Sequence, residues 1–228
     1  MREMDTEKTL LEEAKENFSD LTDTEHDFFR DIEEKETFRK VSELDVPSEN
    51  LPTVRAKCLS WLLQKSRIFR KIDSRSKIII QGVHIQGEIS CGHIILLKML
   101  HFSFCYFSDK IYLFYSEFSS ITFDHSIVTQ DICANHVEIK KSFSFINGSE
   151  AHNCIFLAEA HIGGSLVFTG STVGEKPGAT AINATAVRIG GSVILQPLPN
   201  QWFGKFCFRL CKCSRCIQQF FIIEAEFI

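Results

Sequence analysis

The pattern of hydrophobic and polar residues changes character near residue 77. From Ile78 onward, apolar residues come in pairs separated by one residue, and small or polar residues fill the gaps. Such short alternation is typical of β-strands of minimal length. The clearest pairs are Val83/Ile85, Phe102/Phe104, Ile111/Leu113, Ile121/Phe123, Phe143/Phe145 and Ile155/Leu157. A two-residue strand is not stable alone, so we expect these segments to stack ~4.8 Å apart, with their apolar side chains in shared ladders.

A short phrase built around isoleucine and glycine occurs three times, at residues 85–89, 162–166 and 189–193. The residues that define it are Ile85, Gly87, Ile89, Ile162, Gly163, Gly164, Leu166, Ile189, Gly190, Gly191 and Val193. The last two copies are 27 residues apart, which predicts an insertion at residues 174–180. Other apolar positions, such as Phe102 and Phe118, recur at an offset of 16. The glycines are predicted to lie at corners of the coil, where a positive φ or a close approach of backbones is needed.

These features predict a mainly β protein with an α-helical N-terminal segment. The expected architecture is a right-handed parallel β-helix, or β-solenoid, capped by a helix. Right-handed winding is expected because crossover connections between parallel strands are nearly always right-handed. We divide the chain into an acidic helical segment (1–50), a capping helix and linker (51–76), the β-solenoid (77–195) and a Cys-rich aromatic tail or cap (196–228).

Three helices are predicted ahead of the coil. Residues 6–18 have an amphipathic helical pattern, and a second helix of about twenty residues is expected to begin at an N-cap Thr24. A third helix, with a wide apolar face, is expected after Ser48 or Asn50, with Pro52 in its first turn. This helix is suited to cover the open end of the coil, and binding of a partner is the alternative. The basic residues 65–76 are interpreted as a solvated linker rather than a nucleic-acid or membrane patch.

Charge and aromatic composition add two expectations. Residues 1–50 contain 17 acidic and 7 basic residues, whereas the remainder contains 12 and 18. The acidic segment is either attracted to the basic body or is a solvated arm, and the arm is the simpler interpretation. The chain has 21 phenylalanines but only 3 tyrosines and 2 tryptophans, which indicates aromatic rings kept in a dry interior.

Residues 54–195 resemble bacterial right-handed β-helix proteins related to pentapeptide-repeat proteins, a group with members labelled membrane-associated oxidoreductases. The similarity lies in a Leu/Trp-rich helix at residues 59–63 and in the phrases at residues 82–89 and 159–166. It implies a β-helix fold and, through the label, redox activity at a membrane. The chain departs from the group in its phenylalanines at 102–168 and in Cys91. It also has no Gly-x-Gly-x-x-Gly nucleotide loop, so no residue is assigned to a cofactor.

The nine cysteines are an odd number, and the N-terminus has no secretory signal, so free thiols and a cytoplasmic location are expected. No apolar run is long enough to predict a membrane-spanning helix. Four cysteines of the tail could bind zinc as thiolates, namely Cys207, Cys211, Cys213 and Cys216. Only Cys213 and Cys216 have the spacing of a zinc knuckle, so unmodified thiols are the simpler interpretation. A third interpretation is peripheral membrane attachment through the aromatic and basic residues 201–221.

Chemistry inside the coil is harder to identify. Histidines and cysteines lie close together in sequence at Cys91/His93, His101/Cys105, Cys133/His136 and His152/Cys154. A ladder of metal ligands is one interpretation, and inward cysteines beside corner histidines are the simpler one. Asp124 and His125 lack a recognisable nucleophile, so no catalytic residue is predicted.

The function that these observations favour is a non-enzymatic interaction or scaffold protein. It would use the faces of a short β-solenoid to bind a macromolecular partner, expected to be a protein. The alternatives are a membrane-associated redox enzyme and a peripheral membrane protein anchored through residues 201–221. No cofactor and no nucleic acid are expected, and the oligomeric state is open.

Overall fold

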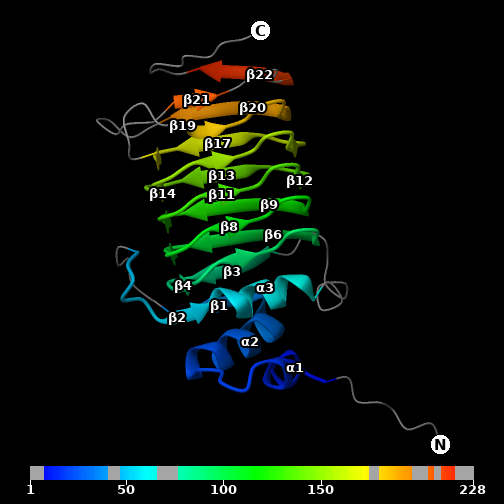
Figure 1. Cartoon of the computed structure of the whole chain (residues 1–228), viewed down its shortest axis with the longest axis vertical. Helices are drawn as coiled ribbons and strands as arrows, with labels where there is room; N and C mark the ends of the chain where they lie inside the picture. Colours follow the sequence, from blue (N-terminus) through cyan, green and yellow to red (C-terminus); the bar gives the residue numbers. More distant parts are fainter. Residues whose placement is uncertain are drawn as a thin grey trace, which may run out of the picture.

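The chain forms a coil of stacked parallel strands with three helices at its N-terminal end, as Figure 1 shows. The computed structural model describes residues 8–40, 47–65, 77–174 and 180–196 with their side chains, and the backbone alone of residues 205–207 and 212–218. Every strand pairing between described residues is parallel. The predicted β-solenoid with a helical N-terminal segment is therefore confirmed.

The wall of the coil consists of three parallel sheets, here called A, B and C. Sheet A contains β1 (Thr37–Arg39), β3 (Lys77–Gln81), β6 (Ile95–Ser103), β9 (Glu117–Asp124), β12 (Glu138–Ile139), β13 (Phe143–Ile146), β16 (His161–Ile162), β17 (Leu166–Thr169), β20 (Arg188–Gln196) and β22 (Lys212–Gln218). Sheet B contains β2 (Thr53–Arg55), β4 (His84–Gln86), β7 (Tyr106–Phe107), β10 (Ile127–Val128), β14 (Glu150–Ala151) and β18 (Thr172–Val173). Sheet C contains β5 (Ile89–Ser90), β8 (Ile111–Tyr112), β11 (Ile132–Cys133), β15 (Ile155–Phe156), β19 (Thr180–Asn183) and β21 (Lys205–Cys207).

A ladder of phenylalanines in the interior sets the repeat. Its members are Phe102, Phe123, Phe145 and Phe168, which are successive partners in sheet A at offsets of 21, 22 and 23 residues. Their ring centroids are 5.4, 4.4 and 5.8 Å apart. The predicted offset of 16 was wrong, because Phe118 pairs with Leu96 rather than with Phe102. Phe118 and Phe123 are two inward positions of one strand, and the sequence pattern does not distinguish these from two successive turns.

The one longer turn lies where the sequence predicted an insertion. Ala151 and Ile155 of one level pair with Val173 and Ile182 of the next, so the connection from sheet B to sheet C gains five residues. Residues 175–179 of this connection are outside the described part of the chain.

The two Ile-Gly-Gly-Ser phrases lie at a bend within sheet A and not at a corner. Ile162 pairs with Ile189, and both side chains are buried. A Cβ on Gly163 would lie 2.5 Å from the carbonyl oxygen of Lys140 on the preceding level. Glycine is therefore required here by the close approach of two backbones. Ser165 Oγ accepts a hydrogen bond from the amide of Ser192 at 3.1 Å, so the serines link successive bends.

The phrase at residues 85–89 is not equivalent to the other two. Ile85 belongs to β4 and Ile89 to β5, and Gly87 lies at the corner between sheets B and C with a φ of 95°. For the repeat glycines, the predicted corner with a positive φ is correct for Gly87; the Gly-Gly pairs do not lie at a corner, but the alternative reason, a close approach of backbones, is confirmed for them.

Helices α1 (Leu10–Asn17) and α2 (Asp23–Lys35) both begin at a capping box, in which a threonine and a glutamate three residues later bond each other's backbone amides. The N-cap of α2 is Thr22, two residues before the predicted Thr24. The helix was also predicted too long, because Phe38 is a strand residue that pairs with Ile80. Phe38 is fully buried, and its burial accounts for the helix-like spacing.

Helix α3 (Ala56–Gln64) covers the first strand of sheet C, as predicted for a capping helix. The amide of Ser90 in β5 donates to Ser60 Oγ at 2.9 Å, and its carbonyl accepts from Gln64 Nε2 at 3.3 Å. The side chains of α3 therefore satisfy an edge that would otherwise be unpaired. The start of α3 was predicted too early, because the carbonyl of Pro52 instead accepts a bond from His84 in the pairing of β2 with β4.

The acidic N-terminal segment is part of the folded body, so its interpretation as a solvated arm was wrong. Phe28 and Phe29 are fully buried, and Trp61 of α3 lies edge-on to Phe29 at 5.6 Å. Ion pairs link its carboxylates to later bases: Glu13 with Lys65 (2.8 Å), Glu25 with Arg55 (2.6 Å) and Glu36 with Lys98 (2.6 Å).

Glu25 is the most completely buried of these carboxylates. It accepts bonds from the amide of Arg55 at 3.0 Å, from its Nε at 2.7 Å and from its Nη2 at 2.6 Å. The thiol of Cys58 lies 3.4 Å from the same carboxylate. Burial alone would raise the pKa of Glu25, but the donors from Arg55 and Thr22 outweigh it and lower the pKa to about 2.

At the other end, the strand pattern extends past Leu195, where the sequence suggested that it stops. The backbone of β21 pairs with β19 in sheet C, and that of β22 pairs with β20 in sheet A. The wall therefore continues into the Cys-rich tail. Of the predicted linker 65–76, Lys65 is described and pairs with Glu13, whereas residues 66–76 and most of residues 197–228 lie outside the described residues.

Candidate functional site

The interior of the coil is filled with apolar ladders, so reactive groups have to be sought on its outer wall. Sheet C, for example, sends Ile89, Ile111, Ile132, Ile155 and Ile182 inward, and all are buried. The buried corner serines Ser126 and Ser149 are bonded to backbone, whereas Ser171 Oγ has no hydrogen-bond partner among the described residues. Ser126 Oγ, for instance, accepts from the amide of Cys105 at 3.1 Å and donates to the carbonyl of Asp124 at 3.0 Å.

Three of the described cysteines, Cys58, Cys91 and Cys105, are unreactive by environment. Burial raises the pKa of Cys58, Cys91 and Cys105 to about 12 in each case. Burial also raises the pKa of Cys133. A thiol with such a pKa is protonated near neutral pH and is neither a good nucleophile nor a good metal ligand.

The histidine–cysteine pairs do not converge. Cys91 points into the core while His93 is exposed at a corner, and Cys105 is likewise buried on a different side of the chain from the outward His101. Among the described residues there is no group of three or more His, Cys, Asp or Glu side chains placed to hold a metal ion.

The predicted zinc set lies mostly beyond what the structure describes. Cys211 is outside the described residues, and for Cys207, Cys213 and Cys216 only the backbone is described. Cys207 belongs to β21 of sheet C, whereas Cys213 and Cys216 belong to β22 of sheet A. The zinc prediction stays a prediction.

Asp124 and His125 form a polar cluster without a nucleophile. His125 Nδ1 and Asn147 Nδ2 lie 2.8 and 3.0 Å from Asp124 Oδ1, and His101 Nε2 is 3.6 Å from Asp124 Oδ2. Burial lowers the pKa of His101, which keeps it neutral near pH 7. The nearest hydroxyl in sequence, Ser126, is bonded to backbone carbonyls instead. The cluster links three levels of the coil and does not form a catalytic triad.

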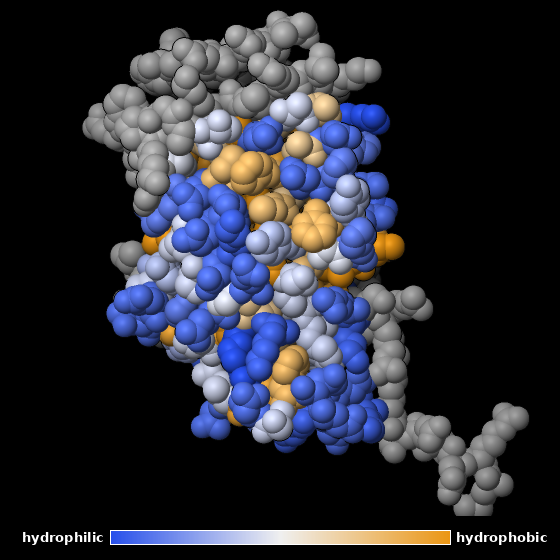
Figure 2. Space-filling view, viewed as in Figure 1, coloured by the Kyte–Doolittle hydropathy of each residue, from blue (hydrophilic) through white to orange (hydrophobic). Residues whose placement is uncertain are grey.

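The outer face of sheet C carries the most distinctive set of side chains. Apolar and aromatic residues occupy its outward positions at successive levels: Tyr112, Phe114, Tyr115, Cys133 and Phe156. We call this set the sheet C patch. Tyr112 and Phe114 lie edge to face at 6.0 Å, and the Phe114 ring covers Gly92 of the preceding level. Figure 2 shows apolar side chains gathered on this face between more polar borders.

A stack of three rings borders the patch at the corner from sheet C to sheet A. The ring of Tyr115 lies parallel to His93 at 5.2 Å and to His136 at 4.6 Å. All three residues have a positive φ, between 56° and 60°, which turns their side chains outward. Tyr115 is 56% exposed and is one of the three large hydrophobic residues most exposed among those described. The other two, Ile95 and Leu97, lie in β6 just beyond the same corner.

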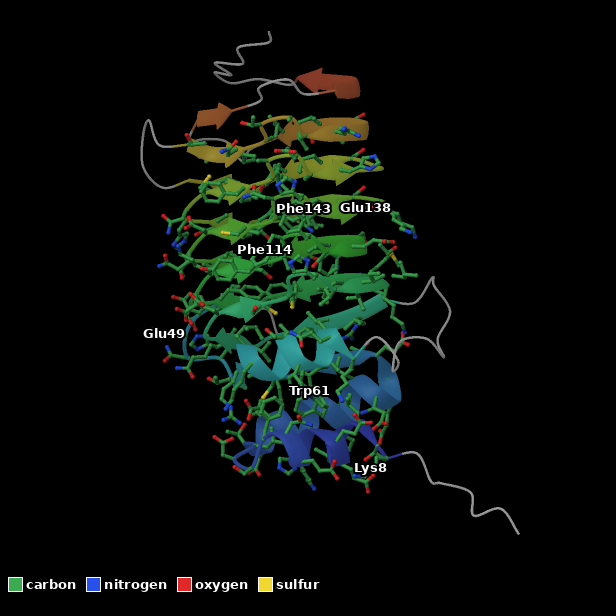
Figure 3. All side chains as sticks on the ribbon, turned by 45° about the vertical axis from the view of Figure 1, so that its right-hand side comes forward. Lys8, Glu49, Trp61, Phe114, Glu138 and Phe143 are labelled. Carbon is green, nitrogen blue, oxygen red and sulfur yellow. The ribbon has the colours of Figure 1, made fainter. Side chains whose placement is uncertain are left out.

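The margins of the patch are acidic. Glu88 and Asp131 lie on the side toward sheet B, and Glu117, Glu138 and Glu159 lie on the side toward sheet A. Two bases also lie there: Lys110, 3.0 Å from Asp131, and Lys140, which pairs with Glu117. Figure 3 labels Phe114 on the wall and Glu138 toward its edge, one level further along the coil. Carboxylates therefore outnumber ammonium groups around an apolar centre.

The sequence analysis did not identify this patch. Its residues alternate with inward isoleucines and leucines, so the aromatic bias was interpreted as buried. Most phenylalanines of the coil are indeed buried, but Phe114 lies on the outer wall. The available signal was the run Tyr112–Tyr115, in which only Leu113 is inward.

Comparison with known proteins assigns no family, because no family model, no curated protein and no solved structure matches the chain significantly. The resemblance to pentapeptide-related β-helix proteins therefore stays a prediction. None of the described helices is both long and apolar enough to cross a membrane.

Proposed function

We propose that this protein is a non-enzymatic interaction module that binds a protein partner through the sheet C patch. The observation that supports the proposal is the grouping of exposed and half-buried aromatic side chains on one side of the coil, centred on Phe114 and Tyr115. Tyrosine and phenylalanine are enriched at protein interfaces, and contiguous exposed apolar surface on a folded protein marks such sites.

The wall behind the patch is rigid, which favours binding. Tyr112, Cys133 and Phe156 stand on strands that pair with strands of the levels before and after, and Phe114 and Tyr115 lie in the turn that follows β8. Phe114 and Tyr115 are further held by neighbouring rings. Few side chains of the patch have to become ordered when a partner binds, so less of the binding free energy is lost as conformational entropy.

The test is selection from a display library of genomic fragments of the source organism against the immobilised full chain. Selection runs in parallel on a patch variant, Phe114→Ser/Tyr115→Ser, and on a control variant, Val167→Ser/Ile194→Ser. The control removes two outward, partly exposed apolar side chains that pair with each other in sheet A. Circular dichroism melting checks that all three chains fold.

Fragments enriched by the unaltered chain and the control, but not by the patch variant, support the proposal. If the unaltered chain enriches no fragment, or if the patch variant enriches the same fragments, the proposal is overturned.

A further inference from the structure

We infer that the partner segment is a short, extended stretch of polypeptide that combines arginine or lysine with apolar side chains. This inference rests on the proposed function and specifies the chemistry of the partner at the same face.

The size of the patch excludes a large interface. It covers three levels of sheet C, from Tyr112 to Phe156, and spans four levels with the His93 corner that borders it; it is about three residues across. With strands ~4.8 Å apart and ~3.3 Å per residue, this is roughly 20 Å by 10 Å once the side chains are included. Such an area is well below the ~800 Å² per partner of a stable protein–protein interface, including a dimer of this chain. An extended peptide of about six residues spans the same 20 Å.

Within the patch no strand edge is open to the segment, because β8, β11 and β15 each pair with a strand on both sides. At one end of the sheet, the backbone of Ser90 in β5 is bonded to Ser60 and Gln64 of α3. At the other end, β19 pairs with β21. Recognition on this sheet therefore relies on side chains across its face and not on main-chain pairing.

The charge around the patch selects a basic partner. Five carboxylates and two ammonium groups lie on its margins, and both ammonium groups are already paired with carboxylates. Glu88 and Glu138 are exposed and form no ion pair with a described residue. A cationic side chain laid over Tyr112 or Phe114 would gain a cation–π contact and reach these carboxylates, whereas an acidic segment would be repelled.

The experiment measures fluorescence anisotropy of labelled six-residue probe peptides titrated with the full chain. The probes are an alternating Arg-Leu peptide, an alternating Glu-Leu peptide and an alternating Ser-Leu peptide. We expect the Arg-Leu probe to bind most tightly, with an affinity that falls as salt rises. The patch variant Phe114→Ser/Tyr115→Ser should lose at least about tenfold in affinity for it.

A border variant tests the role of charge separately. Glu138→Gln/Glu159→Gln should weaken binding of the Arg-Leu probe about three- to tenfold. Its matched control is Asp23→Asn/Glu34→Gln, which removes two exposed carboxylates from α2 and should leave the affinity unchanged. Equal loss in both variants would mean that the probe senses only net charge and would overturn the inference.

The remaining outcomes separate the inference from the proposed function. Equal binding of the Arg-Leu and Glu-Leu probes, or full binding by the patch variant, overturns the inference. A dimer in sedimentation that the patch variant dissolves also overturns it, because a second copy then occupies the face. If the library selects acidic or globular fragments at the patch, the proposed function stands and the inference fails. If neither library nor probe binds the patch, both fail.

Discussion

Replacing Glu25 by glutamine should loosen the N-terminal helices from the coil. Its carboxylate is fully buried, and it receives three donors from Arg55 and one from the Thr22 amide. Ionisation of Glu25 is favoured in the folded state, since its pKa falls from 4.5 to about 2. A shift of that size corresponds to about 3 kcal/mol of stability near pH 7. Glu25→Gln should therefore lower the free energy of unfolding by about 3 kcal/mol, because the neutral glutamine side chain leaves the charge of Arg55 without its buried counter-ion.

The dependence on pH supplies the sharper test. The folded-state pKa of Glu25 lies below the unfolded value, so its contribution is fully present above about pH 4.5. The contribution is lost as the pH falls from about 4.5 to about 2. The difference in stability between the unaltered chain and Glu25→Gln should be constant between pH 5 and 7, by the same linkage, and should shrink below that range.

The assay is urea unfolding followed by the fluorescence of Trp61, which lies against Phe18 and Phe29 of the helical segment. The chain has two tryptophans, so the measurements use a Trp202→Phe background in which Trp61 is the single reporter. Far-ultraviolet circular dichroism follows the coil in the same samples.

The matched control is Glu12→Gln in α1. Glu12 is the corresponding capping-box residue, but it is exposed to solvent and bonds only within its own helix turn. Its replacement should cost clearly less than that of Glu25. Equal losses in the two variants, or a Glu25→Gln effect that persists at pH 2.5, would refute the reasoning from burial.

Three further outcomes follow from the wall of the coil. Gly163→Ala should destabilise the protein by about 1–3 kcal/mol, because the new Cβ meets the Lys140 carbonyl and the backbone has to shift. Thermal melting measures the loss, and an unchanged melting temperature would contradict the close approach of the two backbones. Ser126→Ala should cost about 1–3 kcal/mol in urea unfolding, since the buried amide of Cys105 loses its acceptor, and a neutral effect would show that the corner bond contributes nothing. Cys91 and Cys105 should resist N-ethylmaleimide at pH 8 in the native state and react only on unfolding, as mapped by peptide mass spectrometry. Rapid labelling of either thiol in the folded protein would contradict the raised pKa of both.

The sequence predicted the architecture because the inward ladders leave a direct trace in the hydrophobic pattern. Pairs such as Phe143/Phe145 and Ile155/Leu157 are inward positions of single levels, as expected. The insertion in one long turn was also visible, because Ile162 and Ile189 occupy identical positions on neighbouring levels.

The hydrophobic pattern did not predict which strands are neighbours, nor which apolar side chains lie on the outer wall. The offset of 16 matched Phe102 of β6 with Phe118 of β9 instead of with its true partner Phe123, because a long strand such as β9 contains several inward apolar residues. The candidate site was missed for a related reason. A hydrophobic residue beside an inward one is assigned to the core by default, and only the strand register shows that Phe114 and Tyr112 face outward.

The two hydrogen bonds that Ser90 forms, donating to Ser60 Oγ and accepting from Gln64 Nε2, fix where the coil starts but place no limit on the number of its repeats. Duplicating one repeat between the cap and the patch would move the aromatic surface ~4.8 Å further from the N-terminal helices while leaving the shape of both untouched. The number of repeats therefore sets the distance between the N-terminal helices and the aromatic surface.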